Sequence, residues 1–291
     1  MKRTAIAIMA AACLLLGCDP EEFSGPKPAT TNITCLCVGM ENSQRFGSCS
    51  GCKNDSDRMN SLLSCTYGYP TVLLQSKEAT RDAVISNMAW MVSMTPTNGM
   101  FVFYYSGHGG QESLPGWGTS EPEGKDQEDE YLCLWDSYLL DDELWAIISR
   151  CRGRVFCIFD CCHSETMYRD AEFDSIVPEY LKRSRAPVAV ALGVSKARPG
   201  SFGFSMVRKS AVKMGLGQRM LFWSGCQEKE YSYGGSDGGV MTNEILKNRV
   251  IGEYVDVWDV VKAEVEHKQP TQHPVSTVIG PEEAWHGEVF K

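Results

Sequence analysis

The sequence predicts an α/β fold with a central, mostly parallel sheet. Two apolar runs, Met100–Tyr105 and Arg154–Phe159, are rich in aromatic or β-branched residues and are followed by polar and glycine residues. Such runs are typical of buried strands that open onto a loop. They alternate along the chain with stretches of helical spacing, which favours a parallel sheet. The hydrophobic fraction of 43% is ordinary for a globular chain and allows a sizeable core.

The elements before the second apolar run follow from periodicity and capping. Asp55 has the position of a helix cap, and the apolar residues between Thr80 and Met94 recur at helical spacing. The expected order is strand Asn32–Val38, helix Asp55–Cys65, strand Thr71–Leu74, helix Thr80–Met94, strand Met100–Tyr105, loop Gly109–Glu130, strand Tyr131–Trp135, helix Asp141–Cys151 and strand Arg154–Phe159.

The last part of the chain is expected to contribute one more strand and two helices. Arg219–Gly225 predicts the strand, and Met241–Leu246 and Trp258–Glu266 predict the helices. Pro270 and Pro274 end the second helix, because proline cannot continue it.

The chain begins with a segment typical of targeting. A basic start precedes an apolar stretch that is too short to span a bilayer and that ends in Leu15-Leu16-Gly17-Cys18. This end resembles the bacterial lipobox, so residues 1–18 are expected to be a lipoprotein signal peptide with Cys18 as the lipidation site. Residues 19–31 would form a flexible tether to the cell envelope, facing the periplasm or the surface. An ordinary secretory leader is the alternative.

Charge limits the partners of the protein. A net charge of −9 argues against nucleic acid as a general partner. Residues 181–227, however, hold no Asp or Glu and nine Lys or Arg.

Cysteine is abundant, with 13 residues in the chain. An extracytoplasmic location would permit disulfides. The pairs Cys35/Cys37 and Cys49/Cys52 have spacings found in metal sites, but no second Cys or His pair lies at zinc-finger or ribbon distance. Cys35 and Cys37 alternate with apolar residues and are better interpreted as small buried side chains.

The two strongest strands each end beside a reactive side chain. His108 follows the first run and Cys162 follows the second. Ligands of open α/β sheets bind at the carboxyl ends of the strands, and a Cys–His pair there is the minimum equipment of a thiol protease.

Five motifs in order resemble those of metacaspases, the caspase relatives of bacteria, plants, fungi and protists. The motifs lie within residues 33–250. They are Gly51-Cys-Lys-Asn-Asp55, Tyr105-Ser-Gly-His-Gly109, Asp126-Gln-Glu-Asp-Glu130, Asp160-Cys-Cys-His-Ser164, and the pair Ser224-Gly-Cys226 with Gly238-Gly-Val-Met-Thr242. The resemblance implies a caspase-like α/β/α sandwich, with a large-subunit-like part at 32–180, a basic intersubunit-like loop at 181–218 and a small-subunit-like part at 219–291.

The resemblance also implies the catalytic roles. Cys162 would be the nucleophile and His108 the general base, with His163 as a rival base. The backbone N–H groups of Gly109 and Cys162 would form the oxyanion hole. Cys161 stands where the family often has Ser, and Glu165 where it usually has Gly. A Cys161–Cys162 disulfide would be strained but would act as a redox lock.

Substrate preference follows from an acid near the nucleophile. Asp160 ends a hydrophobic strand, where a carboxylate is costly unless it is paired or receives a charged ligand. In metacaspases the matching acid selects Arg or Lys before the scissile bond, and Glu228 would assist it. A purely structural role for Asp160 is the alternative.

An acidic set of hard oxygen ligands suggests a Ca²⁺ site. Metacaspases often use calcium bound by acids in these segments. Asp141 and Asp142 fit equally well as a helix cap and a first-turn acid. The candidate ligands are Asp126, Asp129, Asp141 and Asp142, with Glu130 beside them.

The basic segment suits cleavage by a protease that prefers basic residues. A solvated basic face, or a patch attracted to anionic lipid headgroups, explains the same composition. The candidate processing residues are Lys182, Arg183, Arg185, Lys196, Arg198, Arg208 and Lys209.

The sequence therefore predicts a lipid-anchored cysteine endopeptidase that cleaves proteins or peptides after Arg or Lys and needs no cofactor for the chemistry. The main alternative is an inactive caspase-like module that binds peptides. A metal-dependent hydrolase would need Cys161, Cys162, His163 and His108 to converge, which adjacent residues rarely do.

Overall fold

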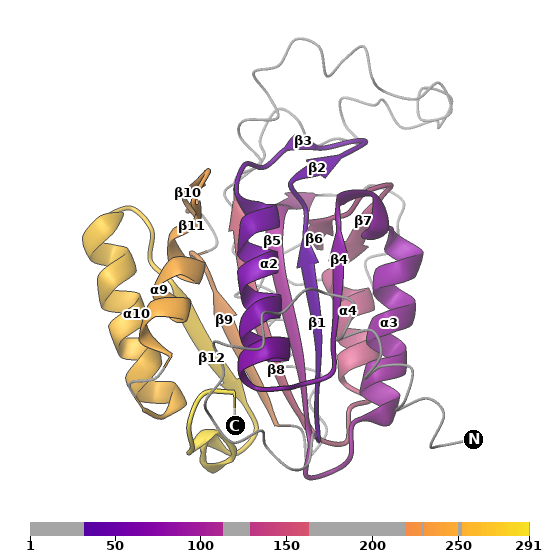
Figure 1. The fold of residues 1–291 in the computed structure, drawn as a ribbon, viewed down its shortest axis with the longest axis vertical. Coiled ribbons are helices and arrows are strands. Elements are labelled where there is room, and N and C mark those ends of the chain that lie inside the picture. The colour runs from indigo at the N-terminus through magenta and orange to yellow at the C-terminus, as the bar shows by residue number, and fades with distance from the viewer. Residues whose placement is uncertain (1–31, 113–128, 163–218, 228–229, 250–251, 291) are drawn as a thin grey trace, which may run out of the picture.

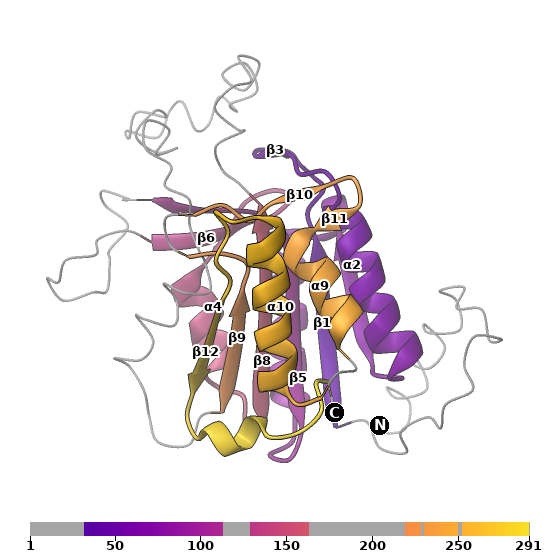
Figure 2. The same ribbon diagram turned by 90° about the vertical axis from the view of Figure 1, so that its left-hand side faces the viewer.

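The computed structural model describes residues 32–112, 129–162, 219–227, 230–249 and 252–290. One sheet forms the middle layer, and helices cover both of its faces (Figure 1). The view along the sheet in Figure 2 places α2, α9 and α10 together on one side and α4 on the other. The predicted α/β fold is confirmed. The helices are α2 (Cys52–Ser61), α3 (Arg81–Met94), α4 (Asp141–Ile148), α9 (Val240–Asn248) and α10 (Tyr254–Lys268).

The order of the main sheet is β12-β9-β8-β5-β1-β4, and β6 and β7 extend it beside β5. The pairs β4–β1, β1–β5, β5–β8 and β8–β9 are parallel, whereas β12 and β6 run antiparallel to their partners. The strands are β1 (Ile33–Gly39), β4 (Thr71–Gln75), β5 (Met100–Glu112), β6 (Asp129–Cys133), β7 (Tyr138–Leu140), β8 (Arg154–Cys162), β9 (Met220–Ser224) and β12 (Val275–Ile279).

Small elements sit around this frame. Two short hairpins and three single-turn segments connect the larger elements. They are β2 (Asn42–Ser43) with β3 (Gly47–Ser48), β10 (Gly234–Gly235) with β11 (Gly238–Gly239), the π-helix Leu62–Thr66, and the 3₁₀ turns Ser76–Glu78 and Glu282–Trp285. β12 and the two hairpins carry too little apolar periodicity to be predicted from sequence.

The two central strands are longer than their apolar runs. β5 continues past His108 to Glu112, and β8 continues to Cys162. Main-chain pairing explains the extension, because the polar and glycine residues that follow Tyr105 pair with β8 and then with β6. Hydrophobicity predicts where a strand is buried, whereas a ladder of backbone hydrogen bonds decides where it ends.

Each face of the sheet has its own core. On one face, α3 and α4 pack on Phe103, Tyr105 and Phe159. On the other, α2, α9 and α10 pack on Tyr104, Phe156 and neighbouring strand residues. Alternate residues of β5 and β8 thus face opposite layers, as the pleat of a strand requires. Because both faces are covered, the central strands read as continuous apolar runs.

The start of α2 differs from the prediction. Gly51 is the N-cap residue, in the left-handed conformation (φ 89°), and the helix begins at Cys52. The expectation that Asp55 caps this helix is wrong: Asp55 lies in the first turn and is fully buried. The other predicted helices are present with shifted ends. Thr80 caps α3, since its side chain accepts a hydrogen bond from Ala83 N.

No helix in the described ranges is both long and apolar enough to cross a bilayer. The segments predicted to be a signal peptide (1–18), a tether (19–31) and a basic loop (181–218) lie outside the described residues.

Candidate active site

The backbones of His108 and Cys162 lie opposite each other at the carboxyl end of the sheet. In the parallel β5–β8 pair, His108 is in register with Cys162 and Ser106 with Asp160. For Cys162 the structure describes the backbone only. The sheet thus brings together two residues that are 54 positions apart in the sequence.

His108 is held by a backbone carbonyl. Its Nε2 lies 3.0 Å from the carbonyl oxygen of Ser48, which ends β3. A carbonyl only accepts, so Nε2 carries the hydrogen and the lone pair of the neutral ring is on Nδ1. The side chain is 4% exposed. Nothing in the sequence marks Ser48, because its contribution comes from the main chain.

The turn around His108 depends on a close approach to Tyr105. The Tyr105 hydroxyl oxygen lies 2.6 Å from the carbonyl oxygen of His108 and 2.7 Å from that of Cys133, so these two acceptors share its single hydrogen. A Cβ at Gly107 would lie 2.5 Å from that hydroxyl oxygen. Only glycine therefore fits at this position without displacing the group that holds the His108 backbone.

Cys161 is a core residue. It is 6% exposed and packs in the cluster beneath α3 and α4. Burial raises the pKa of its thiol well above the usual value, with the charges of Cys226 and Asp160 acting in the same direction. The thiolate is the nucleophilic form, so Cys161 is poorly suited to attack a substrate.

Asp160 is buried and receives three hydrogen bonds. Ser232 Oγ donates to Oδ1 at 2.8 Å, and Thr242 donates to Oδ2 from its backbone N (2.9 Å) and its hydroxyl (2.6 Å). Thr242 is in the first turn of α9, so this carboxylate also meets the positive end of a helix.

Asp55 is a second buried acid at the same place, and sequence reasoning missed its role. Its Oδ2 accepts from Ser106 Oγ (2.9 Å) and from Gly239 N (2.8 Å). Its Oδ1 receives no hydrogen bond among the described residues. Two sequence features could have indicated this role. Asp55 belongs to the Gly-Cys-Lys-Asn-Asp motif, and a glycine at position 239 is consistent with a side chain from another segment lying against the backbone.

The two carboxylates lie against neighbouring glycines, Asp55 against Gly238 and Asp160 against Gly239. A Cβ at Gly238 would lie 2.0 Å from Asp55 Oδ1, and one at Gly239 would lie 2.1 Å from Asp160 Oδ2. Burial and then the charge of Asp160 raise the pKa of Asp55 from 3.8 to about 7, against the donors Gly239 N and Ser106. Burial also raises the pKa of Asp160. The pair therefore disfavours two negative charges unless a cation joins it.

A buried glutamine orients one of the donors to Asp160. Gln272 Nε2 donates to the carbonyl of Gly225 (2.8 Å) and to Ser232 Oγ (3.2 Å). Because Ser232 Oγ accepts from Gln272, its own proton is directed to Asp160. Gln272 Oε1 accepts from Tyr233 N at 3.0 Å. Gln272 follows the last helix, and no sequence motif marks it.

The backbones of Asp129, Asp141 and Asp142, three of the four proposed calcium ligands, lie at one end of the β6–β7 hairpin. Tyr131 pairs with Leu140, which places Asp129 and Asp141 just beyond that pair. Asp141 is the first residue of α4, with Leu140 as the N-cap, and is 2% exposed. For Asp129 and Asp142 the structure describes the backbone. Within the described ranges, no three His, Cys, Asp or Glu side chains are placed to hold a metal ion.

Several predicted residues fall outside the described ranges. His163 and Glu165 are among these. The others are Cys18, Asp126, Glu228, Lys182, Arg183, Arg185, Lys196, Arg198, Arg208 and Lys209.

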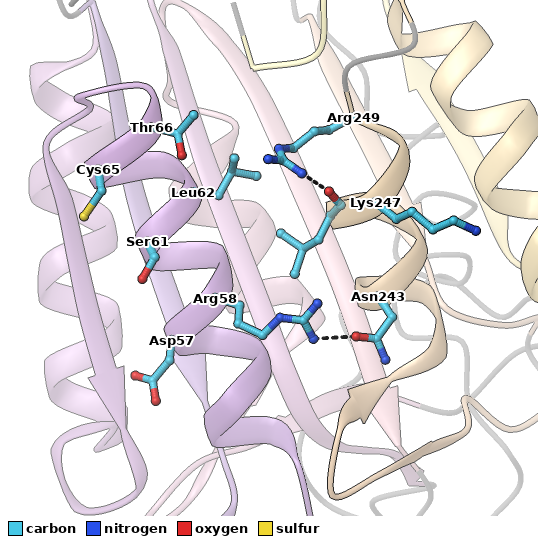
Figure 3. A pocket seen from close by; sticks show the side chains of 10 residues that line it. Asp57, Arg58, Ser61, Leu62, Cys65, Thr66, Asn243, Lys247 and Arg249 are labelled. Atoms are coloured by element: carbon cyan, nitrogen blue, oxygen red, sulfur yellow. Dashed lines mark hydrogen bonds between the residues drawn. The ribbon is translucent and has the colours of Figure 1, made fainter. Parts of the chain in front are cut away.

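A separate cavity of about 490 Å³ lies between α2 with its following π-helix and α9 (Figure 3). Arg58 points across it from α2 and donates to the side chain of Asn243 on α9 at 2.5 Å. Arg58 also donates to the carbonyl of Asp237 at 3.3 Å. The cavity contains neither His108 nor the two buried acids. Through these two hydrogen bonds, Arg58 connects α2 to the segment that contains Gly238 and Gly239.

Known proteins resemble this chain in both sequence and fold. Metacaspase-1 of Cryptococcus neoformans is 29% identical over 144 residues, covering 45% of this chain and 31% of the relative. Metacaspase-1A of Aspergillus oryzae is 30% identical over 159 residues, covering 50% and 38%. The matched part thus spans about a third of these relatives.

A crystal structure of a protein from Geobacter sulfurreducens matches 90% of this chain and 97% of its own, with a TM-score of 0.62 and 24% identity. This likeness supports the fold. A model of the caspase domain family, Peptidase_C14, matches residues 33–279. The chain therefore belongs to the caspase domain family of cysteine peptidases and is metacaspase-like.

Proposed function

We propose that the protein is a cysteine endopeptidase that cleaves after Arg or Lys, with Cys162 as nucleophile and His108 as base. The observation that carries this proposal is the β5–β8 register, which sets His108 opposite Cys162 at the end of the sheet where ligands bind. Family membership supports the reaction class. The raised pKa of the buried Cys161 thiol favours its neighbour as the nucleophile.

The contacts of His108 define its part in the reaction. Its Nε2–H is donated to Ser48, so Nδ1 accepts the thiol proton and later protonates the leaving amine. The thiolate attacks the scissile carbonyl, and the N–H groups of Gly109 and Cys162 stabilise the oxyanion. Water then hydrolyses the acyl-enzyme, with His108 again taking the proton.

The paired acids supply the preference for a basic residue. A guanidinium or ammonium group between Asp55 and Asp160 would remove the repulsion between two carboxylates in a low-dielectric site. Asp55 Oδ1 is the acceptor that no described donor uses. Both acids are fully buried in the structure, so a substrate side chain reaches them only after the groups that cover them move.

Fluorogenic peptides ending in Arg, Lys or Asp test the proposal, with reductant and with or without millimolar Ca²⁺. The purified protein is compared with Cys162→Ala and with the neighbouring Cys161→Ala. We expect turnover after Arg and Lys that is lost in Cys162→Ala and retained in Cys161→Ala. An equal loss of turnover in both variants would contradict the assignment of Cys162 as the nucleophile.

Turnover only after Asp would contradict the role of the buried acids. Binding of an Arg peptide without turnover under every condition would instead favour the inactive peptide-binding module.

A further inference from the structure

Two buried thiols lie in contact beside the candidate active site. No disulfide joins Cys49 and Cys52 in the structure, yet their sulfur atoms are 2.8 Å apart. A disulfide bond is about 2.05 Å long. The two sulfurs are therefore closer than unbonded sulfurs in van der Waals contact but farther apart than a bonded pair.

The turn that holds the pair is fixed by neighbouring contacts. Cys52 N donates to the carbonyl of Cys49 at 3.4 Å, and Gly51 between them adopts a φ of 89°. A Cβ at Gly51 would lie 2.0 Å from the carbonyl oxygen of Gly235. The turn is thus pressed against the β10–β11 hairpin and keeps the two thiols together.

This turn connects two parts of the site. Ser48, one residue before Cys49, offers the carbonyl that accepts from His108 Nε2 at 3.0 Å. Asp55, three residues after Cys52, is the buried acid in the same helix. A Cys49–Cys52 bond would therefore restrict the movement of the neighbouring Ser48 carbonyl, which orients His108.

We propose that Cys49 and Cys52 form a reversible disulfide that fixes the Ser48 carbonyl against His108, so that thiol–disulfide exchange controls the site. The control of peptidase activity rests on the function proposed above, whereas the disulfide itself does not. The oxidised form is the more active one, because the bond restricts the segment that carries Ser48.

The oxidant is a small disulfide such as oxidised glutathione, or a dithiol–disulfide oxidoreductase. Cys49 reacts first, because it is 4% exposed between the exposed Ser48 and Ser50, whereas Cys52 is fully buried. The Cys49 thiolate attacks the oxidant, forms a mixed disulfide and releases one thiol. The Cys52 thiolate then attacks the Cys49 sulfur and releases the second thiol. Two cysteine thiols are oxidised and one external disulfide is reduced to two thiols.

The sequence allows this bond to be detected without interference from other cysteines. Trypsin cuts after Arg45 and Lys53, and the peptide 46–53 contains only Cys49 and Cys52. The full-length protein is equilibrated with mixtures of reduced and oxidised glutathione, alkylated, digested and analysed by mass spectrometry. We expect the peptide to change from doubly alkylated to unalkylated and two hydrogens lighter as the mixture becomes more oxidising. Double alkylation throughout, or glutathione adducts without a disulfide, would overturn the proposal.

A second measurement reports on His108 and does not require peptidase activity. In a Cys162→Ala protein labelled for NMR, we expect the imidazole resonances of His108 to shift on oxidation. The shift should disappear in a Cys49→Ser derivative and persist in Cys151→Ser, whose half-buried thiol lies at the opposite end of β8. Unchanged His108 resonances despite a formed disulfide would refute the link to the site.

In the active protein, Cys49→Ser should lower kcat severalfold relative to the oxidised form, with KM little changed. If the disulfide and the NMR shift are found but no peptide is cleaved, the redox site stands and the proposed peptidase function fails. If peptides are cleaved at the same rate with and without the disulfide, the bond does not regulate peptidase activity.

Discussion

Asp55 and Asp160 are chemically alike but differ in what their oxygens are free to do. Three donors from Ser232 and Thr242 occupy the oxygens of Asp160, whereas Asp55 keeps Oδ1 without a hydrogen bond among the described residues. Asp160 therefore has a structural part at the start of α9 in addition to its charge. Asp55 is the better placed of the two to accept a new donor from a substrate.

Asp55→Asn should reduce kcat/KM for Arg and Lys peptides by roughly 10- to 100-fold, the value of a hydrogen bond to a charged group. The amide keeps the shape of the side chain and an acceptor but loses the negative charge. The matched control is Asp57→Asn on the same helix, a partly exposed acid that pairs with Lys53 at 2.6 Å. Steady-state kinetics of both variants check the prediction, and equal effects in both would contradict it.

The same residue makes stability depend on pH. Folding raises the pKa of Asp55 from 3.8 to about 7, so the folded state keeps a proton that the unfolded state has lost. The free energy of unfolding should therefore fall as pH rises from about 4 to about 7, by about 2–4 kcal/mol. Urea unfolding across this range tests the sign. Asp55→Asn should flatten the curve, and an unchanged slope would show that other groups cause it.

At the scale of elements, the β10–β11 hairpin joins the two halves of the site through its backbone. Gly239 donates its N–H to Asp55, and its Cα lies against Asp160. Arg58 of α2 holds the hairpin from the other side through the carbonyl of Asp237. Bare glycine backbone is needed here because two buried side chains occupy the space that a Cβ would fill.

Gly239→Ala should destabilise the fold by about 1–3 kcal/mol, the range for overpacking a filled site, and should abolish peptide cleavage. The new Cβ would lie 2.1 Å from Asp160 Oδ2. Gly235→Ala in the same hairpin has open space around its Cβ and should stay within about 0.5 kcal/mol of the parent. Thermal unfolding of the two variants tests the explanation. Destabilisation of Gly239→Ala alone indicates a local clash, whereas equal destabilisation of both would indicate a general loss of hairpin flexibility.

The acidic end of the β6–β7 hairpin gives a prediction about calcium. Register brings Asp129 toward the start of α4, where Asp141 is buried, and carboxylates at this density suit Ca²⁺. We expect chelation with EGTA to reduce peptide turnover and Asp129→Asn to raise the Ca²⁺ concentration needed for half-maximal rate. Identical rates with EGTA and with millimolar Ca²⁺ would leave these acids as structural residues.

For the whole molecule, an aromatic cluster joins the carboxyl-terminal elements to the central sheet. Phe156 of β8 packs edge-on against Trp223 of β9 (centroids 4.8 Å apart) and Tyr254 of α10 (5.3 Å). Phe290, near the end of the chain, lies 5.6 Å from the same ring. This cluster packs the carboxyl-terminal elements against β8, the strand that carries Asp160. These elements contain Ser232, Thr242 and Gln272.

Phe156→Ala should lower the free energy of unfolding by about 3–5 kcal/mol, because it opens a cavity at the centre of this cluster. Val255→Ala on the exposed face of α10 is the control and should change it by less than about 0.5 kcal/mol. Denaturant unfolding measures both, and a small effect of Phe156→Ala would show that the cluster does not hold the two parts together.

The sequence alone predicted the α/β fold, the order of the main strands and helices, and the family. Met100–Tyr105 and Arg154–Phe159 became neighbouring parallel strands because long apolar runs must be buried on both faces. It also singled out His108, Cys162 and Asp160, whose chemical roles stay predictions. These signals are local: each is carried by a few consecutive residues.

Only the tertiary structure brought Asp55 to Asp160, the Ser48 carbonyl to His108, and Gln272 to Ser232. Each contact joins segments that are far apart in the sequence or depends on the main chain. Sheet order and register decide such contacts, and no local pattern encodes them. The sequence therefore determined which chemistry the chain carries, and the packing of distant segments decided which groups surround it.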